Sequence, residues 1–181
     1  MSLPLNLLRA MLDSRTSPPV LISACLLGVR CRYDGNHSLC KALVGSLSRI
    51  RPIAVCPEQM GGLPTPREPA NIIGGHGPDV MVGKAKCINR AGQDVTEQFV
   101  KGAHETLRLA RLTGAKVFIG KERSPSCGLK TPYCEAPGGL GTGVTASLLE
   151  KEGISVIEIG PQSPFPTPES TEILESIHQH P

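Results

Sequence analysis

Three cysteines occupy equivalent places in three separate stretches of the chain. Cys25 ends the apolar run VLISA, Cys56 ends the short run PIAV, and Cys127 lies in the loop that follows KVFIG. Short continuous apolar runs of this kind predict buried strands. In an open parallel sheet, ligands collect beyond the carboxyl ends of the strands. The pattern therefore predicts that the three thiols converge on one crevice, although they are far apart in the chain.

Three thiolates at one crevice could hold an iron–sulfur cluster and leave one iron without a protein ligand. Such an iron is a Lewis acid that takes a soft donor such as sulfur. No CxxC pair is present, so the zinc-ribbon pattern of paired CxxC units is absent. The simpler alternative is that these are ordinary buried thiols, which is the commoner role of a free cysteine. Spacing alone leaves both interpretations open.

Polar residues next to two of these cysteines are candidates for catalysis or substrate binding. Glu58 follows Cys56 by two residues, which places its carboxylate to exchange protons with a bound substrate, unless it is a surface residue of a turn. Ser124 and Ser126 precede Cys127, and their hydroxyls could orient a substrate or cap a local turn.

Three charged residues in the first two cysteine-bearing stretches could contact a ligand. Arg32 and Asp34 either pair across their turn or bind substrate, and Arg67 could bind a phosphate or carboxylate through two parallel hydrogen bonds. A solvated side chain is the simpler interpretation for Arg67. The glycine-rich run at 138–143 lacks the Lys-Ser/Thr of a P-loop. It could still present backbone N–H groups to an anion at the start of the next helix.

Composition narrows the class of protein. A chain of 181 residues with 39% hydrophobic residues predicts one domain spanning 1–181, with a core at about 20–159 and a proline-rich tail at 160–181. Aromatic residues make up 3% and the net charge is only +3, which argues against a polymeric nucleic-acid partner. No apolar run approaches the roughly 18 residues of a membrane span. We therefore expect a cytoplasmic protein, in which seven cysteines favour metal or redox chemistry over disulfides.

The order of apolar runs and helical patterns predicts an α/β fold, a Rossmann-like three-layer sandwich with a mainly parallel sheet. We expect strands at 20–24, 53–55, 116–119 and 154–159, and helices at 3–13, 39–49, 94–112, 144–152 and 168–178. In the second helix, Leu39, Leu43, Val44 and Leu47 would share one buried face. Alternation within 79–88 predicts a hairpin that turns at Gly83-Lys84. The Gly/Pro-dense segment 56–77 cannot be regular throughout.

Five ordered motifs give the chain a family resemblance. ISACLLGVRCRYDG, VCPEQMGGLPTPREPA, GQDVTEQFVKGA, SPSCG and GVTASLLEKEG resemble a bacterial and archaeal family that includes the thiouracil desulfurases, over about residues 20–159. The resemblance implies a [4Fe-4S] cluster held by Cys25, Cys56 and Cys127, with the fourth iron free. It also implies Glu58 and Ser124 as the catalytic carboxylate and serine.

The resemblance further implies a non-redox reaction in which a thiolated pyrimidine, as free base or nucleotide, loses its sulfur as hydrosulfide. The partner would be this small molecule, and no sign of the oligomeric state is present. Candidate substrate-binding residues are Arg32, Asp34, Arg67 and Ser126. Two alternatives remain: a non-catalytic cluster- or metal-binding module, and a sulfur-transfer protein that carries a persulfide on Cys31 or Cys134.

Overall fold

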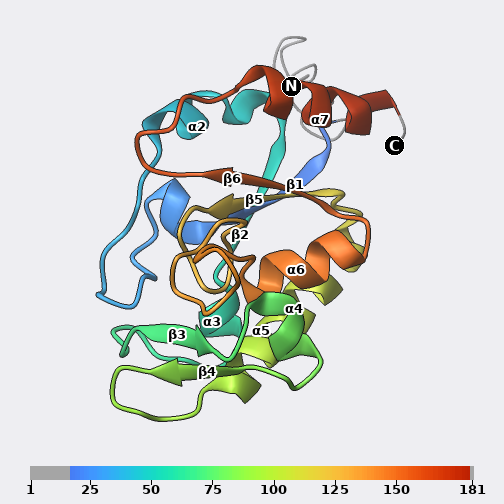
Figure 1. Cartoon of the computed structure of the whole chain (residues 1–181). Coiled ribbons are helices and arrows are strands. Elements are labelled where there is room, and N and C mark those ends of the chain that lie inside the picture. The colour runs from blue at the N-terminus through green and yellow to red at the C-terminus, as the bar shows by residue number, and fades with distance from the viewer. Residues whose placement is uncertain (1–16, 180–181) are drawn as a thin grey trace, which may run out of the picture.

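Four parallel strands form the central sheet of the computed structural model, which describes residues 17–179. Their order is β2-β1-β5-β6, with β1 (Pro19–Ser23), β2 (Arg51–Val55), β5 (Val117–Lys121) and β6 (Ser155–Ile159) (Figure 1). Each lies where an apolar run predicts it. Pro52 is tolerated within β2 because β2 is an edge strand. The predicted helix at 3–13 lies outside the described residues.

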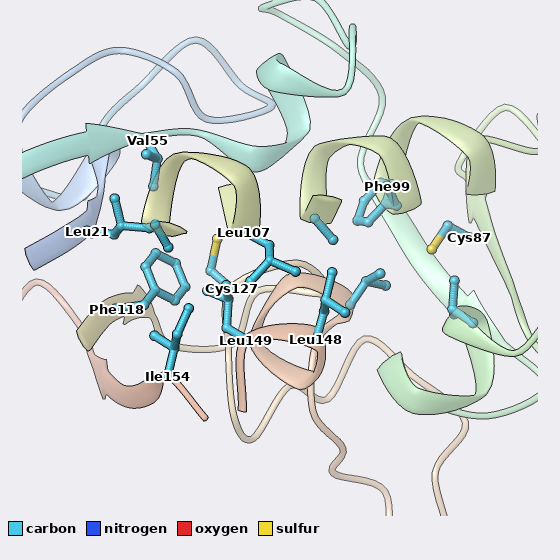
Figure 2. Packing of buried hydrophobic residues seen from close by; sticks show 14 of the residues in the cluster. Leu21, Val55, Cys87, Phe99, Leu107, Phe118, Cys127, Leu148, Leu149 and Ile154 are labelled. Atoms are coloured by element: carbon cyan, nitrogen blue, oxygen red, sulfur yellow. The ribbon is translucent and has the colours of Figure 1, made fainter. Parts of the chain in front are cut away.

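Helices cover both faces of this sheet because alternate strand residues point to opposite sides. Leu21 and Phe118 pack in a cluster that includes residues of α5 (Thr96–Thr113) and α6 (Val144–Lys151) (Figure 2). Ile22 and Ile119 pack in a second cluster with residues of α2 (Lys41–Gly45) and α7 (Pro168–Gln179). Figure 1 shows α2 and α7 on one side of the sheet and α5 and α6 on the other. The predicted three-layer α/β architecture is confirmed.

The connections that follow β1 and its neighbour β5 leave a crevice at the carboxyl ends of these two strands. The connection from β1 to β2 runs through α2 on one face, and the connection from β5 to β6 runs through α6 on the other face. β1 and β5 are neighbours in register, with Ile22 opposite Ile119. Connections that leave neighbouring strands on opposite faces make a topological switch point, where α/β proteins bind ligands.

A second sheet has two antiparallel strands, β3 (Ala70–Ile73) and β4 (Lys86–Asn89). The predicted hairpin at 79–88 is therefore wrong, since α4 (Gly77–Met81) occupies part of it. Helix α4 begins there because Pro78 suits a first turn and the Asp79 carboxylate accepts the His76 N–H at 3.0 Å. The partner of β4 comes instead from the Gly/Pro-dense segment, which also contains the short α3 (Pro57–Met60).

The remaining helices follow the predictions to different degrees. Helix α5 ends as predicted at Gly114, whose φ of 73° suits glycine. The predicted helix at 39–49 is interrupted: α2 ends at Gly45, a 3-10 turn covers Leu47–Arg49, and Val44 is 40% exposed instead of buried. Within residues 17–179, no helix combines the length and apolar composition needed to cross a membrane.

Candidate active site

A cavity of about 550 Å³ opens at the carboxyl ends of β1, β2 and β5. All three predicted thiols line it, together with the fourth cysteine Cys31. Residues of β3 and β4 form part of its wall. The three cysteines therefore converge on one crevice, as predicted.

Cys25 follows β1 in a 3-10 turn, Ala24–Leu27. The turn can close because Gly28 adopts a φ of 94°, a conformation that favours glycine, and donates its N–H to the Cys25 carbonyl at 3.2 Å. The N–H of Ser38 donates to the same carbonyl at 2.9 Å. Cys25 is thus held at the end of a buried strand, and the residue is 7% exposed.

Cys56 is the N-cap residue of α3, and Pro57 occupies the first position of that helix. Helix α3 lies directly on α5 through two glycines. A Cβ atom added to Gly102 would lie 1.9 Å from the Pro57 carbonyl oxygen, and one added to Gly61 would lie 1.9 Å from the Gln98 carbonyl oxygen. This close backbone contact fixes the turn that carries Cys56 against a long helix.

Cys127 sits in a turn capped by Ser124, whose hydroxyl oxygen accepts the N–H groups of Ser126 at 3.2 Å and of Cys127 at 3.1 Å. The first N–H groups of α6 donate to this turn, Val144 to the Pro125 carbonyl and Thr145 to the Ser126 carbonyl, both at 2.9 Å. The predicted anion site at the start of this helix is therefore wrong, because protein carbonyls occupy those donors. Figure 2 shows Cys127 beside Leu107 and Leu149 of the core.

The thiols of the cavity interact with one another. Cys31 is 2% exposed and packs with Cys25 and Cys56. A hydrogen bond with Cys25 raises the pKa of the Cys31 thiol to about 11. A hydrogen bond with Cys31, followed by burial, raises the pKa of Cys56 far above its ordinary value. Burial raises the pKa of Cys127 to about 12, and the nearby Cys56 and Glu58 add to it. Thiols in this state are protonated, so binding a metal centre must release protons.

This set of donors suits a cluster better than a single ion. Among residues 17–179, no three His, Cys, Asp or Glu side chains are arranged to hold one metal ion. The cysteines of a cubane cluster bind different irons, so their sulfurs lie further apart than the ligands of a single ion. Soft thiol donors around a half-buried hollow with no histidine in its lining are the donors that iron–sulfur clusters use. Cys25, Cys56 and Cys127 therefore fit such a group.

Glu58 lines the cavity two residues after Cys56, in the first turn of α3. Its carboxylate Oε2 accepts the Nε–H of Arg67 at 2.7 Å, and the side chains are 18% and 5% exposed, respectively. Arg67 also lines the cavity, but its guanidinium is engaged by the protein. The arrangement can hold a negatively charged carboxylate next to the thiols.

Two predicted substrate-binding residues do not reach the cavity. The Ser126 hydroxyl pairs with that of Thr145 at 2.9 Å, and the residue is only 1% exposed because α6 covers it. Asp34 is exposed and pairs with Arg32 at 2.9 Å. This hydrogen bond is the main cause that lowers the pKa of Asp34 to about 2. Of that turn Arg32 and Tyr33 line the cavity, and the structure does not place Ser126 or Asp34 in its lining.

Several cavity residues carry no motif signal of their own. Ser23 ends β1, accepts the N–H of Lys121 at 3.1 Å and hydrogen-bonds to Cys127. The sequence could have indicated Ser23 as a cavity residue, because it lies in the same apolar run directly before Ala24 and Cys25. Arg90, which directly follows β4, lines the cavity, and so does Arg123, which has a left-handed backbone conformation with a φ of 53°.

The other three cysteines of the chain lie elsewhere. Cys40 and Cys87 are fully buried in the two hydrophobic clusters, and Cys134 donates its S–H to the Thr131 carbonyl at 3.2 Å. None of the three lines the cavity. These three thiols are therefore not positioned to bind a group in the cavity.

The fold and the site together define a parallel α/β protein with a thiol-lined cavity at its switch point. The profile of the 2-thiouracil desulfurase family matches residues 20–159, and the chain belongs to this family. It is 44% identical over 141 residues to the uncharacterized protein YbbK of Bacillus subtilis (strain 168), covering 76% of this chain and 93% of YbbK. It also matches the structure of the [4Fe-4S]-dependent thiouracil desulfidase TudS (DUF523Vcz), with 32% identity and a TM-score of 0.70, over 88% of this chain and 99% of TudS.

Proposed function

We propose that this protein is a desulfidase that removes sulfur from thiolated pyrimidines by hydrolysis, using a [4Fe-4S] cluster held by Cys25, Cys56 and Cys127. Membership of the 2-thiouracil desulfurase family and similarity to the [4Fe-4S]-dependent TudS support this activity. The observation that carries the assignment of residues is the convergence of the three thiols on one cavity beside the Glu58 carboxylate.

The residues of the cavity have defined tasks in such a reaction. When bound, a cluster with one iron not held by protein supplies a Lewis acid for a thiocarbonyl sulfur. Glu58 takes a proton from water, whose oxygen attacks the carbon that bears the sulfur. The C–S bond breaks, a C=O bond forms, and sulfur leaves as hydrosulfide, so no electrons are transferred. The Ser124 oxygen accepts two backbone N–H groups, which leaves its own O–H to donate to the substrate.

The charge of the cavity favours an anionic substrate. Five basic side chains line it and Glu58 is its only acidic lining residue within the described chain. The basic residues are Arg32, Arg67, Arg90, Lys121 and Arg123. Such a lining attracts a phosphate, and a cavity of about 550 Å³ has the size of a small-molecule site. We infer a thiolated nucleoside monophosphate as the preferred form over the free base, and no polymeric nucleic acid. Free cysteines throughout residues 17–179 suit the reducing cytoplasm.

The test is sulfide release by anaerobically purified protein from 2-thiouracil and from a thiouridine monophosphate. We expect release from both, with a higher kcat/KM for the nucleotide. A protein that contains iron and sulfide but releases no sulfide from either compound would instead be a cluster-binding module.

The Cys31→Ala variant separates the desulfidase from a persulfide carrier. Under our proposal it retains turnover within about tenfold of the wild-type rate, since Cys31 is neither a cluster ligand nor a sulfur acceptor. Complete loss of turnover with the cluster intact would favour the persulfide carrier.

A further inference from the structure

Arg67 is one of the most engaged side chains at the cavity. Its Nε donates to Glu58 Oε2 at 2.7 Å, and its Nη1 donates to the Cys31 carbonyl at 3.1 Å. Nη1 also lies 3.1 Å from the Thr65 hydroxyl and from the Pro64 carbonyl. With the side chain only 5% exposed, these contacts are shielded from water. A guanidinium with two of its nitrogens engaged in this way is poorly placed to turn toward a substrate phosphate.

The same residue joins two loops that carry different cysteines. The backbone N–H of Arg67 donates to the Tyr33 carbonyl at 2.8 Å, and its side chain reaches the Cys31 carbonyl in the same loop. That loop begins at Cys25, whereas Arg67 and Glu58 belong to the segment that begins at Cys56. The Cys56 thiol lies 3.7 Å from the same Cys31 carbonyl, so it shares this acceptor with Arg67. The Arg32 side chain, by contrast, donates to Asp34 and Ser38, which lie close to it in the chain.

We propose that Arg67 is a positioning residue and not a substrate-binding residue. It fixes the Glu58 carboxylate toward the reacting carbon, and it sets the separation of the Cys25–Tyr33 loop from the Cys56–Arg67 segment. This inference rests on the proposed desulfidase function for its kinetic consequences, but the linkage of the two loops stands on the contacts alone. The fork of the guanidinium is required, because lysine has a single nitrogen and cannot bond Glu58 and the Cys31 carbonyl in the same way.

Kinetics with two substrates distinguish the two roles. We expect Arg67→Lys and Arg67→Gln to lower kcat by about a hundredfold for both 2-thiouracil and a thiouridine monophosphate, since a misplaced catalytic group has an effect of that size. The KM values should change by less than about threefold. A rise in KM confined to the nucleotide, with kcat unchanged, would show that Arg67 binds the phosphate and would overturn the proposal.

A double-substitution cycle tests whether Arg67 acts through Glu58. In a Glu58→Gln background, the further change Arg67→Gln should lower kcat by less than about tenfold, because the carboxylate that Arg67 positions is already gone and only its link between the two segments remains to be lost. A full second loss, equal to that in the wild-type background, would contradict the proposal.

Amide hydrogen exchange of the full chain tests the linkage without any activity. In Arg67→Lys we expect faster exchange at Arg32, Gly35 and Leu63, whose N–H groups close the turns on either side of the link. Exchange at Val117 and Phe118 of β5 should be unchanged, which shows that the variant is folded. Unchanged exchange at all five amides would overturn the linkage. If the wild-type protein releases no sulfide, the proposed function fails while this measurement still decides the role of Arg67.

Discussion

The two walls of the cavity are built differently. The cysteine wall consists of residues at the ends of three parallel strands, and its three thiols are held by a 3-10 turn, an N-cap and a serine-capped turn. The ribbon wall consists of β3 and β4, a two-stranded sheet outside the central one, which contributes the exposed side chains of Asn71, Ile73 and Arg90. Groups that perform chemistry need fixed positions, whereas groups that select a substrate can be more exposed. We therefore assign chemistry to the cysteine wall and substrate selection to the ribbon wall.

The largest effect should come from disturbing the helix contact under the cysteine wall. In Gly102→Ala the new Cβ would lie 1.9 Å from the Pro57 carbonyl oxygen, so the turn that carries Cys56 and Glu58 must move. We expect a loss of about 3 kcal/mol in the free energy of unfolding and at least about a hundredfold loss of sulfide release. Urea unfolding measures the first effect and an assay of sulfide release measures the second, with iron content determined on the same samples.

Gly45→Ala is the matched control for that substitution. Gly45 is also in a helix, and a Cβ atom there would meet nothing within 4 Å. We expect unchanged iron content and activity. If Gly102→Ala behaves like Gly45→Ala, the glycine contact does not fix the cysteine wall.

A change on the ribbon wall should affect binding without affecting chemistry. In Arg90→Gln we expect about a tenfold higher KM for a thiouridine monophosphate, from the loss of a charged hydrogen-bond donor, with kcat and cluster content unchanged. Steady-state kinetics with the free base as comparison check this. A loss of kcat that is equal for both substrates would remove the distinction between the two walls.

The smallest effect concerns Asp34, which lies outside the cavity and pairs with Arg32 at its edge. Arg32 lowers the pKa of Asp34 to about 2, so the pair stabilises the fold above the ordinary pKa of 3.8 and this stabilisation is lost as the pH falls toward 2. Because the pair is exposed, we expect Asp34→Asn to cost only about 0.5 kcal/mol at pH 7. Thermal unfolding should show this difference at pH 7 and a smaller one at pH 3. A difference that grows on acidification would exclude this ion pair as its cause.

The cysteine wall could be predicted from the sequence because two simple rules determine it. Short apolar runs predict the strands, and the parallel sheet brings their carboxyl ends to one edge, which places Cys25, Cys56 and Cys127 together. The role of Arg67 could not be predicted, because its link to the Cys31 carbonyl depends on how two loops fold against each other. Ser126 was predicted to bind substrate because nothing in the sequence indicates that α6 covers its hydroxyl.

The ribbon wall was missed for a different reason. The alternation at 79–88 indicates a hairpin, yet β4 pairs with residues 70–73, and the intervening segment forms α4 because of its own capping residues. Short strands in Gly/Pro-dense segments have too few residues for their periodicity to decide between partners. Pairing at this distance depends on where α4 packs, which in this structure is against α6.

The most direct test of the account is iron and sulfide content, with the anaerobic absorption spectrum, of four single variants and the wild-type protein. Cys25→Ser, Cys56→Ser and Cys127→Ser each remove one proposed ligand, and Cys134→Ser changes a partly buried thiol outside the cavity. We expect about four irons and four sulfides per chain in the wild type and in Cys134→Ser, and neither the cluster nor its brown colour in the other three. A complete cluster in any of those three variants would contradict the assignment.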